Sequence, residues 1–165
     1  MIDVIDKIAN GGRQLLSVLA HLCGRLLLVL VVIQFAIVLA RYVFAINFLW
    51  LQELAVYLNA SIFMLAAAWG LICNKHVRID VFWGRLAAKG KRRVEQIGTL
   101  IFLLPMMAAI LIASVPYVSQ SWAIWEGSTE ISGLPGLFLL KTLLPVFAAL
   151  LFLAGLVRLW HLDRE

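Results

Sequence analysis

Histidine and cysteine are the residues in this chain best suited to metal, haem or redox chemistry, and the chain has few of them. They are His21, His76, His161, Cys23 and Cys73. A membrane haem needs histidines that face one another inside a bundle, zinc needs three or four clustered ligands, and a thiol oxidoreductase needs paired cysteines. These five residues instead fall singly near the expected helix ends. We therefore expect no enzyme: no catalytic residue, no cofactor and no metal site.

Charged residues, the usual parts of an ion or proton pathway, avoid the middle of every apolar run. The uncharged runs are residues 26–40, 54–74 and 96–125, and a fourth run, 131–157, is interrupted only by Lys141. A long lysine side chain near a helix end can extend back to the interface. The sequence also has no Gly-x-x-x-x-Gly-Lys-Ser/Thr loop to bind a nucleotide phosphate. These absences favour an accessory role in transport.

The length of these uncharged runs indicates transmembrane helices. With 64% hydrophobic residues and a mean hydropathy of +0.99, the chain is too apolar for a soluble domain. Each crossing of a hydrocarbon core of about 30 Å takes roughly 20 residues. We predict an all-α polytopic membrane protein, a single domain over residues 1–165, with four transmembrane helices at about 22–44, 52–74, 96–120 and 134–158.

The distribution of Lys and Arg predicts the orientation. Most of these residues lie in the N-terminal flank, in the 75–95 segment and after the fourth helix, and few lie on the other side. The positive-inside rule then places both termini in the cytoplasm. The net charge of +5 needs no nucleic acid as partner. Anionic phospholipid headgroups are the expected contacts of the basic cluster Arg85, Lys89, Lys91, Arg92 and Arg93.

Two further features concern the first half of the chain. Apolar residues recur near helical spacing before Gly11 and Gly12, which indicates a short amphipathic helix on the inner leaflet, ahead of the first span. Gln34 and Asn59 are the polar residues at mid-depth. Gln34 lies roughly 18 Å from the inner edge of the hydrocarbon core and Asn59 roughly 12 Å from its outer edge, so the two share a level. An interhelical hydrogen bond between them is one interpretation; separate contacts to backbone or to a partner protein are the other.

Three short motifs together resemble one family. They are Arg41-Tyr42-Val43-Phe44 followed by Trp50 and Glu53; the run from Lys75 to Phe82, with His76 and Asp80, after Ala68-Trp69-Gly70; and Gly133-Leu134-Pro135 followed by Lys141 and Pro145. In the order of these motifs, in chain length and in the number of spans, the chain is similar to the small membrane subunit of tripartite ATP-independent periplasmic (TRAP) transporters. This subunit is the Q-type or DctQ-like component.

The resemblance implies a non-catalytic scaffold in a bacterial inner membrane. Its partners would be a large multi-spanning M-type subunit, which carries substrate and sodium, and a periplasmic P-type substrate-binding protein. The cargo would be a small organic anion such as a carboxylic acid. The alternative is a self-sufficient small transporter or channel that works as an oligomer, for which Gln34 and Asn59 offer few pore-lining groups.

The resemblance also points to structural or interface roles for Trp50, Glu53, His76 and Asp80. Glu53 could pair with Arg41 or Lys141 at the outer rim. Asp80 could pair with Arg78, His76 or a basic group on the large subunit. For Glu53 and Asp80, an ordinary solvated charge at the membrane surface is the alternative.

Overall fold

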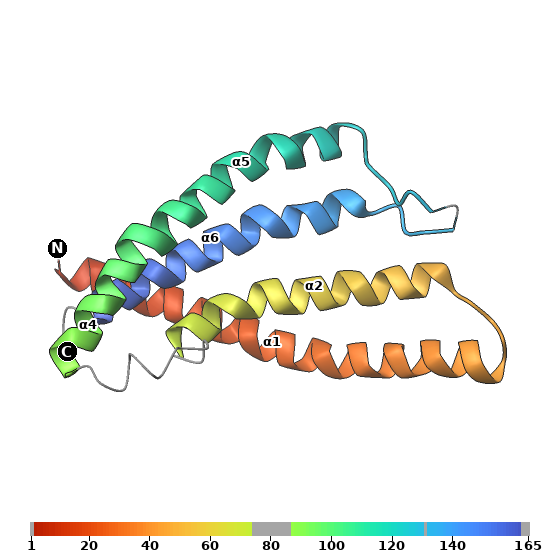
Figure 1. Cartoon of the computed structure of the whole chain (residues 1–165), viewed down its shortest axis with the longest axis horizontal. Helices are drawn as coiled ribbons and strands as arrows, with labels where there is room; N and C mark the ends of the chain where they lie inside the picture. Colours follow the sequence, from red (N-terminus) through yellow and green to blue (C-terminus); the bar gives the residue numbers. More distant parts are fainter. Residues whose placement is uncertain (1, 74–86, 131, 163–165) are drawn as a thin grey trace.

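The described part of the chain contains four long apolar helices, as the sequence predicts. The computed structural model describes residues 2–73, 87–130 and 132–162. Over these residues it is all-helical, without strands (Figure 1). The elements are α1 (Ile2–Val43), α2 (Leu49–Ile72), α4 (Ala88–Ile97), the π-helix η1 (Gly98–Leu103), α5 (Leu104–Ala123) and α6 (Leu137–Leu162). Four helical stretches are long and apolar enough to cross a membrane: Asn10–Val43, Leu49–Ile72, Lys89–Ala123 and Leu137–Trp160.

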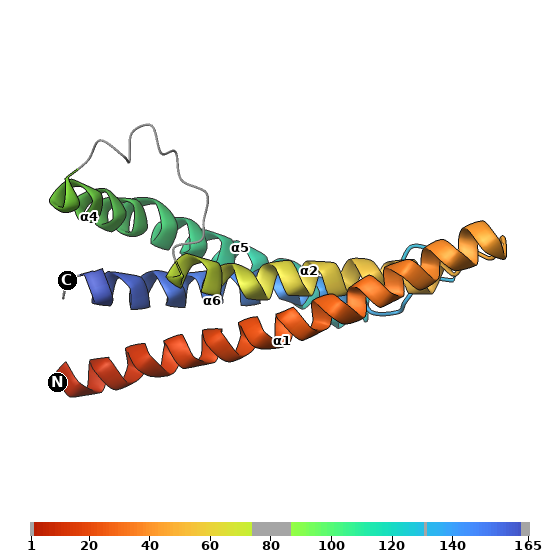
Figure 2. The same cartoon turned by 90° about the horizontal axis from the view of Figure 1, so that it is seen from below.

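Helix α1 is longer than expected. It runs without a break from Ile2 to Val43 (Figure 2). The separate helix predicted before Gly11 and Gly12 is thus not an element of its own, and the expected start at residue 22 is wrong. At 1.5 Å per residue α1 is about 63 Å long, roughly twice a hydrocarbon core of about 30 Å. Part of α1 therefore lies outside the core.

The third span also begins earlier than the expected residue 96. Helices α4, η1 and α5 follow one another from Ala88 to Ala123, so the polar turns of α4 extend the apolar run at its basic end. The π-helical turns of η1 directly precede Pro105, whose ring and missing N–H interfere with the regular hydrogen bond to the preceding turn. The wider turn accommodates the proline without ending the helix. The second and fourth spans lie within a few residues of their predicted bounds.

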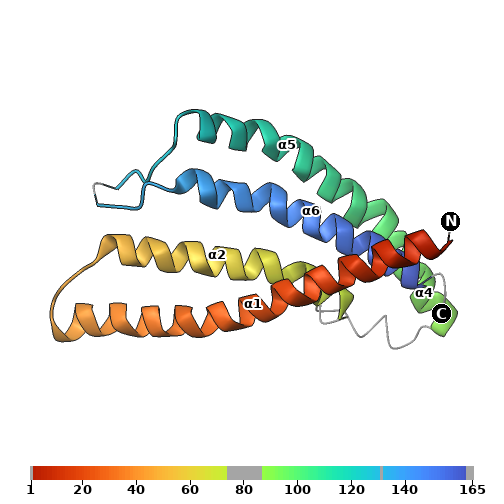
Figure 3. The ribbon, with the colours of Figure 1, turned by 180° about the vertical axis from the view of Figure 1, so that it is seen from behind.

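Helix α6 is the centre of the arrangement. It packs against α1, α2 and α5, while α1 packs mainly on α2 and α5 mainly on α6. Figure 1 shows the helices side by side in the order α5, α6, α2, α1. Seen from behind, the first part of α1 crosses α6 near the end where the chain begins and α6 ends (Figure 3). The arrangement is an open layer, and two connections that the structure describes, the one after α1 (44–48) and the one after α5, lie at the opposite end.

Small side chains on α6 allow this packing. The main buried cluster contains Leu16, Ala68, Met107, Ala148, Leu151 and Ala154. Ala148 and Ala154 are fully buried, as is Ala68 on α2. A Cβ added at Gly12 of α1 would lie 3.2 Å from Cγ2 of Val157, so the crossing of α1 over α6 is close. Small residues at such crossings let helix backbones approach, as is typical of membrane helices.

Candidate functional site

Glu53 connects the start of α2 to the loop between α5 and α6. Its Oε1 accepts a hydrogen bond from the Ser128 hydroxyl, and its Oε2 accepts one from the backbone N–H of Leu134 at 2.6 Å. The Ser128 N–H in turn donates to the Leu134 carbonyl at 3.1 Å. Hydrogen bonds to a charged acceptor are stronger than neutral ones. The carboxylate therefore fixes two ends of the same loop onto α2.

Gly133 is needed for this contact. A Cβ at this position would lie 2.7 Å from Oε1 of Glu53 and still closer to the side chain of Ser128. Real Cβ atoms do not come this near to other atoms. The motif Gly133-Leu134-Pro135 thus supplies a close approach at Gly133 and a backbone donor at Leu134.

A second carboxylate, Glu126, lies in the same loop and pairs with Lys141 of α6. Its Oε2 accepts hydrogen bonds from the Lys141 ammonium and, at 2.6 Å, from the Ser121 hydroxyl at the end of α5. The Lys141 and Glu126 side chains are 17% and 27% exposed. The hydrogen bond from Lys141, and then that from Ser121, lower the pKa of Glu126 below its ordinary value of 4.5. Glu126 is therefore held in its charged form.

Lys141 is held on its other side by an aromatic ring. Its Nζ lies 4.4 Å from the centroid of the Tyr117 ring, within the range of a cation–π interaction. This contact adds to the ion pair with Glu126. Lys141 is thus engaged from both α5 and the loop that follows it.

Aromatic rings pack beside this ion pair. Trp122 and Trp125 contact each other and the Phe138 ring edge to face, with centroids 4.6 to 5.8 Å apart. The Trp122 indole N–H donates to the Thr142 hydroxyl at 2.9 Å. Aromatic side chains with a polar handle are typical of the boundary between hydrocarbon and water. The ends of α5 and α6 are therefore joined by polar and apolar contacts together.

The predicted partners of Glu53 were wrong. It bonds Ser128 and Leu134 instead of Arg41 or Lys141, because the irregular backbone of the loop brings these donors over the start of α2. Arg41 and Trp50 are exposed. His76, Asp80 and Arg85 lie outside the described residues. Sequence reasoning did not select Ser121, Ser128 or Glu126, although the acidic stretch 125–130 was the available signal. It included Gly133 as part of a motif but gave it no contact.

The interpretation of Gln34 and Asn59 as a hydrogen-bonded pair is also not what the structure shows. Both side chains are exposed, and no hydrogen bond joins them within the described part of the chain. Their equal depth placed them at one level, but the rotation of α1 and α2 directs both amides to the surface of the molecule. Either lipid or a partner protein must therefore surround them.

The opposite end of the molecule is joined by Arg158 of α6. Its guanidinium is 2.9 Å from Oε2 of Glu95 and donates to the Leu71 carbonyl at 2.5 Å, and the side chain is only 9% exposed. The Trp160 indole N–H donates to Asp6 at 2.8 Å. Arg158 and Trp160 thus tie α6 to α2, α4 and α1.

The described residues of the predicted basic cluster lie on α4. Lys89 and Arg93 are exposed, and Lys91 and Arg92 are half-buried.

These two networks hold helices and loops in place. In residues 2–73, 87–130 and 132–162, no three His, Cys, Asp or Glu side chains gather as a metal site would require. The ionisable groups described above join elements at the two ends of the layer. The arrangement can therefore present a fixed surface at each end.

Comparison with known proteins gives the family. Among curated proteins, none matches the chain. The family model of the tripartite ATP-independent periplasmic transporters, DctQ component, matches residues 29–165. This range takes in Glu53, the loop 124–136, Lys141 and Arg158. The chain therefore belongs to the DctQ family, the small membrane components of TRAP transporters.

Proposed function

We propose that this chain is the non-catalytic scaffold of a sodium-driven importer of a small organic anion such as a carboxylic acid. The DctQ family belongs to tripartite systems that also have a large membrane component and a substrate-binding component. In the proposal, the large subunit carries substrate and sodium, the periplasmic protein captures substrate, and this chain is a rigid support. Residues 1–165 then act as one four-helix domain.

The position of the charges is the observation that carries the proposal. Together with the four apolar helices, the family match makes the chain a multi-pass protein of the bacterial inner membrane. Apart from Lys141 near the start of α6, no Lys, Arg, Asp or Glu occurs in residues 26–40, 54–72, 96–123 or 137–157 of the spans. Ionisable residues inside a membrane mark ion paths. A subunit whose charges lie at the ends suits a supporting role.

The proposed orientation has both termini in the cytoplasm. The first residue of α1 and the end of α6 lie at one end of the molecule with the basic helix α4 (Figure 1). Positive residues favour the cytoplasmic side. The first turns of α1 then lie in the inner interface, and the basic residues of α4 attract anionic phospholipid headgroups. The network of Glu53 and Glu126 faces the periplasm.

Exposed amides support a membrane partner. Gln34 and Asn59 are exposed at mid-depth on neighbouring helices. A polar group in hydrocarbon without a hydrogen-bond partner is costly, whereas polar groups of another helix satisfy it. We propose that these amides contact the large subunit. Among the sequence-derived candidates, Arg41, Trp50, His76 and Asp80 remain proposed interface residues.

The test of this function is uptake. Cells that contain the large subunit and the binding protein should import a radiolabelled small carboxylate only when this chain is also present, and only with sodium outside. The purified chain alone in liposomes should transport nothing. Transport by the chain alone would instead establish the self-sufficient oligomeric transporter.

A further inference from the structure

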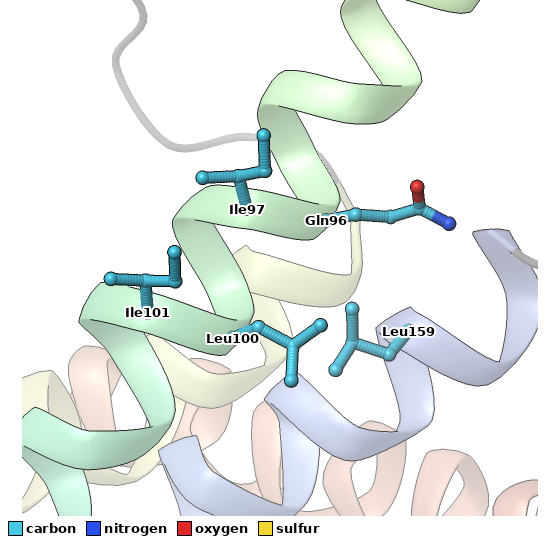
Figure 4. A pocket seen from close by; sticks show the side chains of 5 residues that line it. All are labelled: Gln96, Ile97, Leu100, Ile101 and Leu159. Carbon is cyan, nitrogen blue, oxygen red and sulfur yellow. The ribbon is translucent and has the colours of Figure 1, made fainter.

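A groove opens between α6 and the helix that contains α4 and η1. The two helices approach closely at Gly155, where an added Cβ would lie 3.0 Å from Leu103 and 3.1 Å from Leu104. One turn further along α6, an open groove of about 410 Å³ lies between the two helices. It is lined by Gln96, Ile97, Leu100, Ile101 and Leu159 (Figure 4). This volume is within the range of about 300–1,000 Å³ that holds small ligands.

The lining of the groove is apolar except at one edge. Figure 4 shows Gln96 and Leu100 projecting toward Leu159 of α6, while Ile97 and Ile101 lie one above the other along their helix. Four of the five lining residues are aliphatic. The groove therefore offers a hydrocarbon surface, with a single amide where η1 meets α4.

The ion pair between Arg158 and Glu95 fixes the width of the groove. Arg158 directly precedes Leu159, and Glu95 directly precedes Gln96. Their side chains are mostly buried and 2.9 Å apart. Contact at Gly155 and this ion pair together hold the two helices at a set separation, so the groove is part of the folded structure.

Positive charges follow the apolar lining toward the start of α4. Lys89, Arg93 and Ile97 follow one another at intervals of four residues, so they lie on one face of the helix. Lys89 and Arg93 are both exposed. A basic surface directly followed by an apolar one matches a molecule with an anionic head and a hydrocarbon tail.

We propose that this groove binds one anionic phospholipid. One acyl chain lies against Ile97, Leu100, Ile101 and Leu159, and the phosphate headgroup is bound by Lys89 and Arg93. The site extends the general attraction of α4 for anionic lipid that is part of the proposed function. It differs in requiring one bound molecule at one place.

The experiment measures lipid bound to the purified full chain. The chain is stripped of lipid in mild detergent and incubated with equal amounts of phosphatidylglycerol and phosphatidylcholine, and native mass spectrometry counts the bound lipid. Lys89→Gln with Arg93→Gln should weaken phosphatidylglycerol binding about 30-fold, since each basic group near an anionic surface contributes about fivefold. Leu100→Trp, which fills the groove, should also abolish the binding of the single lipid.

Matched controls separate this site from net charge and from simple burial. Arg13→Gln with Arg25→Gln removes the same charge from exposed positions on α1, and Ile112→Trp enlarges a side chain that is 73% exposed on α5. Both should bind phosphatidylglycerol as the unmodified chain does. Equal loss in the two charge variants, equal binding of both lipids, or unchanged binding by Leu100→Trp would each overturn the proposal. None of these outcomes depends on uptake or on the large subunit.

Discussion

Glu126 illustrates how single residues stabilise the outer end of the molecule. Lys141 and Ser121 hydrogen-bond to its carboxylate and lower its pKa below 4.5. A group with a depressed folded-state pKa contributes stability above its unfolded pKa, and this contribution is lost as the pH falls through the folded pKa. Thermal unfolding of the chain and of Glu126→Gln in detergent should therefore differ at pH 7 and converge in acid. A difference that persists at the lowest pH would contradict this role.

Gly133 provides a second test at the scale of one residue. Gly133→Ala should displace Ser128 from Glu53 and lower the free energy of unfolding by about 1–3 kcal/mol, because partly buried hydrogen bonds to a carboxylate are lost. Limited proteolysis should then cut the loop 124–136 faster. Gly11→Ala is the control, since an added Cβ there meets nothing within 4 Å. Equal behaviour of the two variants would contradict the proposed close approach.

Some of this site could be predicted from the sequence. Glu53 was selected through the family resemblance of its motif, and Lys141 stood out because it interrupts an apolar run; both are engaged in the network. Their partners could not be predicted, because residues 124–130 and 132–136 follow an irregular path with no periodicity. Only the folded backbone places Leu134 over α2 and Glu126 beside α6.

At the scale of elements, both outer helix ends use a left-handed residue that is not glycine. Ala45 follows α1 with φ 54°, and Trp125 follows α5 with φ 48°. After α5, the hydrogen bonds from the Glu126 N–H to the Ser121 carbonyl and from the Trp125 N–H to the Trp122 carbonyl are those of a Schellman motif. After α1, the Ile46 N–H instead donates to the Ala40 carbonyl, six residues back. The aromatic contacts of Trp125 explain its retention there. Ala45, in contrast, is exposed.

Ala45→Gly should therefore stabilise the chain. A left-handed conformation costs a residue with a Cβ about 1–2 kcal/mol, and the added freedom of glycine in the unfolded chain costs about 0.4–1 kcal/mol. The net gain should be about 0.5–1 kcal/mol, measured by reversible unfolding in detergent. Ala36→Gly, inside α1, should bring no gain. Easier unfolding of Ala45→Gly would show that the end of α1 is not strained.

Helix number was predictable because uncharged runs of sufficient length have few other uses. Helix ends were less so. The turns of α4 and the first turns of α1 carry charged residues. Such helical turns can form outside the hydrocarbon core, where charged side chains are tolerated. The sequence marks where hydrocarbon ends, whereas the helices continue into the interface.

The whole molecule is an open layer around α6, and many of its large apolar side chains are exposed. Gln34→Leu with Asn59→Leu should weaken association with the large subunit by about 0.6–2 kcal/mol for each hydrogen bond lost. The chain itself should remain as stable, because both side chains are exposed. Val32→Leu, at an exposed position on α1, is the control. Unchanged association of the double variant, measured by co-purification, would place the amides away from the partner.

The rotation of the helices was the part of the architecture that the sequence could not supply. In a soluble helix the apolar stripe shows which side is buried. The spans here are apolar all round, and lipid-facing and protein-facing surfaces have the same composition. Gln34 and Asn59 could therefore be assigned a depth but not a direction.

Purification of the tagged chain from its native membrane in gentle detergent tests the central claim most directly. The account predicts that one large multi-spanning protein co-purifies in fixed stoichiometry. The spans of that protein should contain ionisable residues of the kind that the middle of this chain's spans lacks. A chain that emerges alone, or as a homo-oligomer that transports solute in liposomes, would contradict the scaffold function.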